Sequence, residues 1–326
     1  MSAPELRICL DETDLDAALR LDARRGLTSH PKYLPMRLHY DGRGSTMFGE
    51  LTRQPEYYQT RSERAILHDN AAAIAQSLGD GPVSVIELGA GRAEKIRPVL
   101  GALADGGRLD AFWPFDVAAG EVRDVLLELA TAYPDAYLGG IIGDFTRHLN
   151  QLPDHHDTRM VAFLGGTFGN FTPMERSQFL SDLREALRPG DWFLLGADLV
   201  KDPEVILAAY NDAAGVTAEF NRNVLYVLNH RLDADFEPDN FEHIALWDND
   251  TATIEMRLRA MKPMSVDLSA LSLDISFTVG EEIHTGISTK FQRGELENQL
   301  QATGFEPVRC WTDANDYMGV FLARAV

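Results

Sequence analysis

The residues with the clearest chemical meaning surround two glycines that follow an apolar run. Residues 83–86 are Val-Ser-Val-Ile, and Glu87 then leads to Gly89 and Gly91. We expect a strand, a glycine turn and a helix over 93–104, which together form the first unit of a nucleotide-binding α/β sheet. Because glycine has no Cβ, the backbone of the turn can approach a ligand closely.

The charges around this turn indicate the kind of ligand. A dinucleotide fingerprint has a third glycine where this chain has Glu94, so a pyrophosphate would meet the carboxylates of Glu87 and Glu94. That clash disfavours an NAD(P)-dependent oxidoreductase. A ligand with an ammonium and a sulfonium group would be attracted, and S-adenosylmethionine has both. We expect Lys95, in the first helical turn, to pair with the methionine carboxylate of that ligand.

Further ligand-binding side chains follow the next two predicted strands. Asp116 lies near the end of the strand over 110–117, and Asp144 and Phe145 follow the strand near 136–142. Ligands of an open α/β sheet bind beyond the carboxyl ends of its strands. Asp116 can accept hydrogen bonds from both ribose hydroxyls, Asp144 can accept one from an adenine amino group, and Phe145 can stack on the ring. The set favours recognition of adenosine.

The pattern of apolar residues predicts a doubly wound parallel sheet and a large insertion. Strands are expected over 83–88, 110–117, 136–142, 159–164 and 191–198, with helices over 62–78, 93–104, 119–133 and 173–187. The N-terminal part contributes a helix over 15–25 and a turn-rich stretch over 31–58. Between 199 and 290 we expect helices over 203–213, 216–229 and 238–244 and strands over 252–261, 270–278 and 283–291. A helix over 293–303 and two strands then complete the sheet.

The composition disfavours several classes of partner. The 326 residues carry a net charge of −20, which opposes binding to nucleic-acid phosphates. Cys9 and Cys310 form no metal or redox motif, and no basic-then-apolar leader or membrane-length apolar run occurs. We expect a cytoplasmic monomer that acts on a small molecule, with no bound metal, no membrane and no nucleic acid.

Five longer segments carry a resemblance to a known family. They are 41–63, 87–95 (Glu-Leu-Gly-Ala-Gly-Arg-Ala-Glu-Lys), 163–173 (Phe-Leu-Gly-Gly-Thr-Phe-Gly-Asn-Phe-Thr-Pro), 209–225 and 287–291 (Ile-Ser-Thr-Lys-Phe). Together they resemble the histidine-specific N-methyltransferases of ergothioneine biosynthesis, over essentially the whole chain. The resemblance implies a class I Rossmann-like methyltransferase domain over 63–198 and 291–326. It also implies an α+β substrate-binding domain over 1–62 and 199–290.

The resemblance also implies an activity and a set of site residues. The activity is S-adenosylmethionine-dependent methylation of the α-amino group of a free amino acid, carried to the trimethylated betaine, which for histidine is hercynine. Tyr57 would be the catalytic residue that holds the amine, and Asn170 and Tyr210 would donate to the carboxylate. The cofactor residues would be Glu87, Gly89, Gly91, Lys95, Asp116, Asp144 and Phe145. The remaining substrate residues would be Phe48, Gly165, Thr217, Met256, Gly286 and Ser288.

One position departs from the family pattern. The family has Thr-Glu-x-Ser, whose glutamate and serine hold the imidazole, whereas this chain has Thr285-Gly286-Ile287-Ser288. Losing a charge-assisted hydrogen bond costs about 1.5–3 kcal/mol. The missing side chain also leaves open volume, so the pocket could accept a larger or less polar ring such as indole or phenol, and Phe168 could reshape it further. Alternatively, Glu282, His284 or a water supplies the polar contact.

Two further alternatives stay open. The chain could be a non-catalytic protein that retains the S-adenosylmethionine site, or a methyltransferase that acts on RNA or protein. Binding of the cofactor without turnover of any amino acid would favour the first. A basic surface groove would favour the second.

Overall fold

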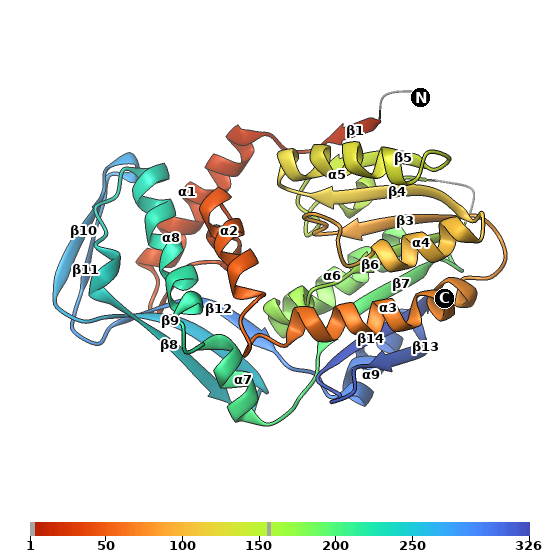
Figure 1. The fold of residues 1–326 in the computed structure, drawn as a ribbon. Helices are drawn as coiled ribbons and strands as arrows, with labels where there is room; N and C mark the ends of the chain where they lie inside the picture. The colour runs from red at the N-terminus through yellow and green to blue at the C-terminus, as the bar shows by residue number, and fades with distance from the viewer. Residues whose placement is uncertain (1–3, 155–157) are drawn as a thin grey trace. The chain divides into compact units, whose positions relative to one another are not determined.

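A computed structural model of the chain describes residues 4–154 and 158–326, which form two compact units (Figure 1). The first unit comprises residues 1–11, 59–199 and 291–326, and the second comprises residues 12–58 and 200–290. Each unit has a β-sheet of its own. In the described part of the chain, none of the helices has the length and apolar character needed to cross a membrane.

The first unit contains an eight-stranded sheet in the order β1-β5-β4-β3-β6-β7-β14-β13. Its strands are β1 (Glu5–Ile8), β3 (Val83–Leu88), β4 (Leu109–Asp116), β5 (Tyr137–Ile142), β6 (Thr158–Phe163), β7 (Trp192–Asp198), β13 (Phe305–Thr312) and β14 (Met318–Ala325). In this sheet the strands β1, β5, β4, β3, β6 and β7 pair in parallel, while β14 is antiparallel to both β7 and β13. The order reverses at β3, and such a switch point is where an open α/β sheet binds its ligand.

Helices cover both faces of this sheet. They are α3 (Gln59–Ser77), α4 (Arg97–Asp105), α5 (Ala119–Ala132), α6 (Pro173–Ala186) and α9 (Arg293–Ala302), with short 3-10 turns over Leu149–Gln151 and Thr167–Asn170. The chain moves one way from β3 to β5 and the other way from β6 to β7. Right-handed crossovers therefore place α4 and α5 on one face and α6 on the other. Buried residues of α6 and α9 share one apolar core with the sheet.

The second unit contains the insertion and most of the N-terminal segment. Its four-stranded sheet has the order β2-β12-β9-β8, beside a hairpin of β10 and β11. The strands are β2 (Lys32–Tyr33), β8 (Phe241–Asp248), β9 (Thr253–Ala260), β10 (Met264–Leu268), β11 (Leu273–Phe277) and β12 (Glu282–Thr289). The helices are α1 (Glu12–Thr28), α2 (Gly42–Leu51), α7 (Pro203–Tyr210) and α8 (Val216–Leu232), with 3-10 turns over Met36–His39, Pro238–Asn240 and Ser269–Leu271. Residues from α1, α8 and the strands form its core.

Several predicted elements differ from the structure. The turn-rich stretch contains helix α2, which Asp41 caps by accepting from the Gly44 N–H. The helix predicted over 238–244 is a short 3-10 turn followed by strand β8. The strand predicted over 270–278 is found as β11, and its partner β10 was not predicted. Residues 5–8 are predicted in the substrate domain, but β1 hydrogen-bonds to β5 and so belongs to the large sheet.

Candidate active site

The glycine turn after β3 has the backbone conformation that the motif predicts. Gly89 and Gly91 have φ angles of 64° and 49°, in the left-handed region that glycine tolerates best. The Gly91 N–H donates to Asp116 Oδ2 at 2.9 Å, which joins the turn to the end of β4. Helix α4 begins at Arg97 rather than at 93, because Ala93 also has a positive φ of 50° and the turn continues. Lys95 therefore lies in the turn and not in the helix.

Glu87 places a carboxyl group beside this turn. Its side chain is buried, and among the described residues its Oε2 atom has no hydrogen-bond partner. Burial raises the pKa of the Glu87 carboxyl to about 8, and Lys95 offsets part of this rise. A buried carboxyl of this kind is suited to a cationic ligand and unsuited to a phosphate. The turn and Glu87 thus fit a ligand with ammonium and sulfonium groups.

Sequence reasoning missed the residue that holds Lys95. Glu63 of α3 is fully buried, lies 2.9 Å from Lys95 Nζ, and accepts from the Gly165 N–H at 2.8 and 2.9 Å. A Cβ at Gly196 would collide with Glu63 Oε1, so β7 needs a glycine there. Glu63 therefore connects Lys95 with the turn after β6. Glu63 ends the resembling segment 41–63, but a glutamate in the first turns of a helix is equally typical of a helix start, so its position does not indicate a role in the site.

The other predicted adenosine-binding residues lie at the same edge of the sheet. Asp116 uses Oδ1 to accept from the Ala118 N–H at 3.0 Å, and Asp144 Oδ1 accepts from the backbone and hydroxyl of Thr146 at 2.9 and 2.6 Å. The ring of Phe145 packs edge-on against Phe163, 5.1 Å between centroids. A Cβ on Gly89 would lie 3.5 Å from Phe145. The ends of β3, β4 and β5 thus bring the predicted cofactor residues together.

The turn after β6 carries the two predicted substrate residues of the first unit. Gly165 follows β6, and Asn170 is half-buried at the end of the 3-10 turn over Thr167–Asn170. Phe168 is predicted to reshape the pocket, but it is fully buried and stacks on Phe291 with 5.6 Å between ring centroids. Phe168 is therefore a core residue, and its packing fixes the turn that presents Asn170.

The second unit gathers the predicted aromatic residues into one cluster. Tyr57 is buried and contacts Phe48 of α2 edge-to-face, with 6.1 Å between ring centroids. Phe48 and Tyr40 both contact Phe220 of α8, at 5.9 and 5.5 Å. Thr217, one turn before Phe220, is buried and donates its N–H to Asp212 at 2.7 Å. Phe220 was not predicted, because its place in α8 shows only helical periodicity.

A β-bulge in β12 decides which way Gly286 faces. His284 pairs with Arg257 and Gly286 pairs with Met256, so Thr285 is an extra residue. Side chains of directly paired residues share a face, and a one-residue shift moves every later residue of the strand to the other face. Gly286 therefore shares the buried face of β9 with Met256.

The space beside Gly286 is occupied by methionines. A Cβ built on Gly286 would lie 2.9 Å from Met36 Sδ and 3.2 Å from Met256 Cε. Met256 is buried, and Met36 packs against the cluster that holds Tyr57. The prediction that the missing glutamate leaves open volume is therefore wrong, because flexible thioether side chains fill the space.

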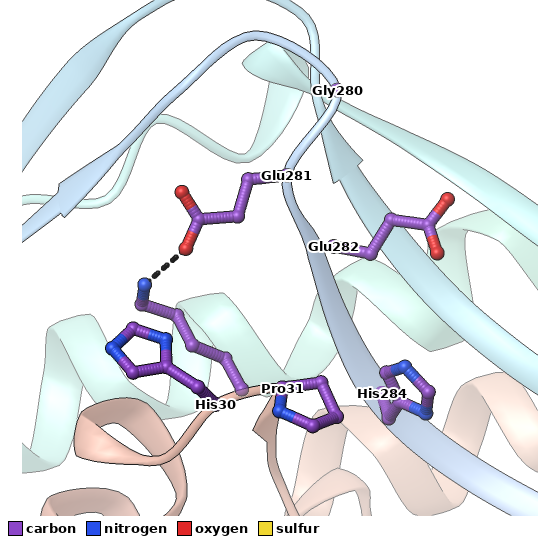
Figure 2. Close-up of a pocket in the computed structure, with 7 residues that line it drawn as sticks. His30, Pro31, Gly280, Glu281, Glu282 and His284 are labelled. Atoms are coloured by element: carbon purple, nitrogen blue, oxygen red, sulfur yellow. Dashed lines mark hydrogen bonds and ion pairs between the residues drawn. The ribbon is translucent and has the colours of Figure 1, made fainter.

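Glu282 and His284 lie on the opposite face of β12 from Gly286, which excludes them as substitutes for the missing glutamate. Glu282 accepts from Arg257 and Arg259, at 2.7 and 2.6 Å, and His284 lies 3.7 Å from Glu255. Both line a separate surface pocket with His30, Pro31, Lys32, Gly280 and Glu281 (Figure 2). In that pocket Lys32 pairs with Glu281.

Polar side chains complete the face that carries Gly286. Ser288 is buried two residues further along β12, and its hydroxyl accepts from Lys290 Nζ at 2.8 Å. Lys290 also donates to the Tyr210 hydroxyl, at 2.9 Å. Lys290 was missed, although residues two apart on a strand share a face and it stands two after Ser288.

A buried network holds the bulge in place. The Thr285 hydroxyl donates to Asn221 Oδ1 at 2.6 Å and contacts the Met256 carbonyl at 3.0 Å. The Asn221 amide donates to His243 Nδ1 at 2.9 Å, and His243 Nε2 donates to the Tyr210 carbonyl at 2.9 Å. The network thus joins the bulge to the end of α7, where Tyr210 stands.

Comparison with known proteins identifies the family. A family model described as "Histidine-specific methyltransferase, SAM-dependent" matches residues 19–325. The chain belongs to this family. It is therefore an S-adenosylmethionine-dependent methyltransferase, and the family, the fold class and the methyl donor predicted from the sequence are confirmed. An oxidoreductase function finds no support.

Two relatives of this methyltransferase cover nearly its whole length. The Histidine N-alpha-methyltransferase of Mycolicibacterium smegmatis is 46% identical, and that of Mycobacterium tuberculosis is 43% identical, each over 94% of both chains. Among solved structures, the CcbJ methyltransferase from Streptomyces caelestis is similar with a TM-score of 0.42 and 16% identity, over 79% of this chain and 94% of that one. Among the described residues of the methyltransferase, no group of three or more His, Cys, Asp or Glu side chains could hold a metal.

Proposed function

We propose that this methyltransferase methylates the α-amino group of free L-histidine, and that repeated transfer gives the trimethylated betaine. The observation that carries the proposal is the identity of 46% and 43%, over 94% of both chains, to two Histidine N-alpha-methyltransferases. The donor supplies a methyl group on a sulfonium, which the amine lone pair attacks. The protein has to orient the two reactants, and orientation accounts for a large share of such a barrier.

The proposed roles follow from the chemistry of each side chain. Asn170 and Tyr210 donate to the substrate carboxylate through an amide N–H and a hydroxyl. Tyr57 hydrogen-bonds the amine and directs its lone pair. The amine must be neutral to react, and a phenol with a pKa near 10 is a weak base at neutral pH, so solvent takes the proton. Glu87, Gly89, Gly91, Lys95, Asp116, Asp144 and Phe145 hold the donor.

The contact between the protein and the side chain of the substrate differs from the contact that the resemblance implies. No carboxylate stands at Gly286, and the methionines beside it offer an apolar wall. Within β12, Ser288 is the polar residue on the face that carries Gly286. We propose that histidine binds through Ser288. The apolar wall also supports a second candidate, methylation of tryptophan or tyrosine by the same chemistry.

A screen of the twenty amino acids with S-adenosylmethionine separates the two candidates. We expect histidine to have the highest kcat/KM. A higher kcat/KM for tryptophan or tyrosine would show that this amino acid, and not histidine, is the preferred substrate. Cofactor binding without product from any amino acid would instead indicate a non-catalytic binding protein.

Restoring the glutamate tests the interpretation of Gly286. Because a Cβ there would crowd Met36, Gly286→Glu is combined with Met36→Ala, and Gly286→Ala with Met36→Ala is the matched control. We expect the ratio of kcat/KM for histidine to that for tryptophan to be about 10- to 150-fold higher in the glutamate variant than in the control. This factor corresponds to the free energy of one charge-assisted hydrogen bond. If both variants have the same preference, Gly286 does not set specificity.

We also propose that the enzyme is a cytoplasmic monomer without a nucleic-acid partner. The support is the net charge of −20 and the two cysteines, Cys9 and Cys310, which are both free thiols. Light scattering after size-exclusion chromatography tests the monomer. Binding of RNA at physiological salt would contradict the proposed substrate class.

A further inference from the structure

A lysine is buried in the second unit beside two predicted substrate residues. Lys290 has 2% of its surface exposed and follows directly after β12. Its ammonium group donates to the Tyr210 hydroxyl at 2.9 Å and to the Ser288 hydroxyl at 2.8 Å. It also lies 4.6 Å from the centroid of the Tyr210 ring. Three interactions of one ammonium group thus converge on these two side chains.

The strand places this lysine where it can reach both hydroxyls. Gly286, Ser288 and Lys290 stand at alternate positions, so they continue along one face of β12. Tyr210 approaches from the end of α7. Burying an ammonium group is costly unless it is hydrogen-bonded, and the two hydroxyls and the aromatic ring contribute to offsetting that cost. The arrangement is therefore a built polar site.

The ammonium group restricts what the two hydroxyls can do. A hydroxyl has one hydrogen to donate and two lone pairs, whereas an ammonium group can only donate. Tyr210 and Ser288 must both accept from Lys290, so the hydrogen of each is left for another acceptor. A hydrogen bond from a charged donor is stronger than one from a neutral donor, and hydrogen bonds that share a group polarise one another. Each hydroxyl is thereby prepared to donate to an electron-rich group.

We propose that Lys290 is a positioning residue that sets the Tyr210 and Ser288 hydroxyls as donors to the amino-acid substrate. Tyr210 donates to the α-carboxylate, and Ser288 donates to an acceptor atom of the side chain. The positive charge of Lys290 reaches the carboxylate through Tyr210 without direct contact. This inference rests on the proposed function, because it needs an amino acid bound at Tyr210.

Substitution of the lysine tests the inference. Lys290→Met removes the ammonium group and keeps the chain length, and Lys290→Gln keeps an uncharged N–H donor in case the methionine variant does not fold. Lys201→Met is the matched control, because Lys201 donates to the Tyr58 hydroxyl at 2.8 Å and lies 4.3 Å from its ring centroid. It makes the same kind of contact with a tyrosine that has no proposed substrate role.

We expect a specific kinetic pattern. Lys290→Met should raise KM for histidine about 10- to 100-fold with a smaller fall in kcat, Lys290→Gln should give an intermediate KM, and Lys290→Arg should restore most of the loss. The Kd of S-adenosylhomocysteine should stay within about two-fold in all of them. Equal KM values in the Lys290→Met, Lys290→Gln and Lys201→Met variants would overturn the inference.

A substrate without a carboxylate separates positioning from a general structural role. Histidinol has an alcohol in place of the carboxylate, so it offers the Tyr210 hydroxyl a neutral acceptor instead of an anionic one. The effect of Lys290→Met on KM should be smaller for histidinol than for histidine, because only the contact through Ser288 is fully retained, and equal effects would contradict the role. If the wild-type enzyme methylates no amino acid, the proposed function itself fails. If it methylates histidine while Lys290 variants behave like Lys201→Met, only the role of Lys290 fails.

Discussion

At the scale of single residues, the carboxylate of Asp116 connects the glycine turn after β3 with the end of β4. Its two oxygens accept from the N–H groups of Gly91 and Ala118, at 2.9 and 3.0 Å, while a carboxylate can accept about four hydrogen bonds in all. It therefore retains capacity for the ribose hydroxyls of the methyl donor. The sequence predicts this residue as a ribose ligand, because its carboxylate stands at the end of the second strand beside the other predicted adenosine-binding residues.

Replacement of this carboxylate should weaken cofactor binding. Asp116→Asn turns one acceptor oxygen into a donor that faces an N–H group, so we expect the Kd of S-adenosylhomocysteine to rise roughly 10- to 100-fold by calorimetry. Asp110→Asn is the control on the same strand, where Asp110 accepts from Ser84 at 3.2 Å. Equal affinities of the two variants would show that Asp116 does not bind the cofactor.

Residue-level prediction was limited wherever a role depends on the partner. Lys95 was predicted from the motif, but Glu63, which pairs with it, lies 32 positions earlier on α3, and its place at the end of segment 41–63 does not indicate this pairing. Lys290 lies inside a recognised motif and went unassigned, because its function lies in the hydroxyls that it contacts. Pairings between distant segments exist only after the chain has folded.

At the scale of secondary-structure elements, the β-bulge at Thr285 determines which face of β12 carries Gly286. Without it, Gly286 would point to the face occupied by Glu282 and His284. The buried contact of Thr285 with Asn221 holds the extra residue in position. Strand periodicity could locate β12 to within two residues, but a bulge depends on how β12 pairs with β9 and left no signal in the sequence.

Loss of the Thr285 hydroxyl should destabilise the bulge. Thr285→Val keeps the shape and removes the donor that lies 2.6 Å from Asn221 Oδ1, so we expect the free energy of unfolding to fall by about 1–3 kcal/mol. Thr289→Val is the control on the same strand, where the hydroxyl lies 3.2 Å from that of Thr253. Urea denaturation measures both, and an equal loss would show that the network adds nothing to the bulge.

A second histidine joins the same network, because His39 Nε2 lies 3.3 Å from Asn221 Oδ1, and the two histidines make stability depend on pH. Burial lowers the pKa of both His39 and His243 from the ordinary 6.5, so the unfolded chain takes up protons that the folded chain does not. Their contribution to stability is complete above about pH 6.5 and declines as the pH falls further. A variant with His39→Gln and His243→Gln should lose less stability between pH 7.5 and 5.5, roughly, than the wild type. The exposed His68→Gln is the control, and parallel losses in all three proteins would contradict this cause.

Helices and strands that show a clear run or period of apolar residues were predicted close to their observed bounds, whereas those without such a pattern were missed or assigned to the wrong type. The strands of the large sheet other than β1 were located to within a residue or two, because most of them are buried runs between clear turns, whereas the largely exposed β1 was not predicted. Helix α2 contains Gly42, Gly44 and Gly49, which lower helix propensity, so its formation depends on tertiary contacts. Strand β8 was mistaken for a helix although Phe241, His243, Ala245 and Trp247 alternate along it.

At the scale of the whole molecule, the two compact units divide the proposed roles. The first supplies the residues assigned to the methyl donor, together with Gly165 and Asn170. The second supplies the aromatic cluster and the face of β12 that carries Gly286, Ser288 and Lys290. The division follows from the sequence, since an insertion after β7 interrupts a recognisable α/β sheet.

The position of the transferred methyl group tests the central claim most directly. The enzyme is incubated with L-histidine and S-adenosylmethionine labelled with carbon-13 in its methyl group, and the product is examined by NMR. We predict labelled methyl groups on the α-nitrogen and an equal amount of S-adenosylhomocysteine. Label on a ring nitrogen, or bound cofactor with no labelled product, would contradict the account.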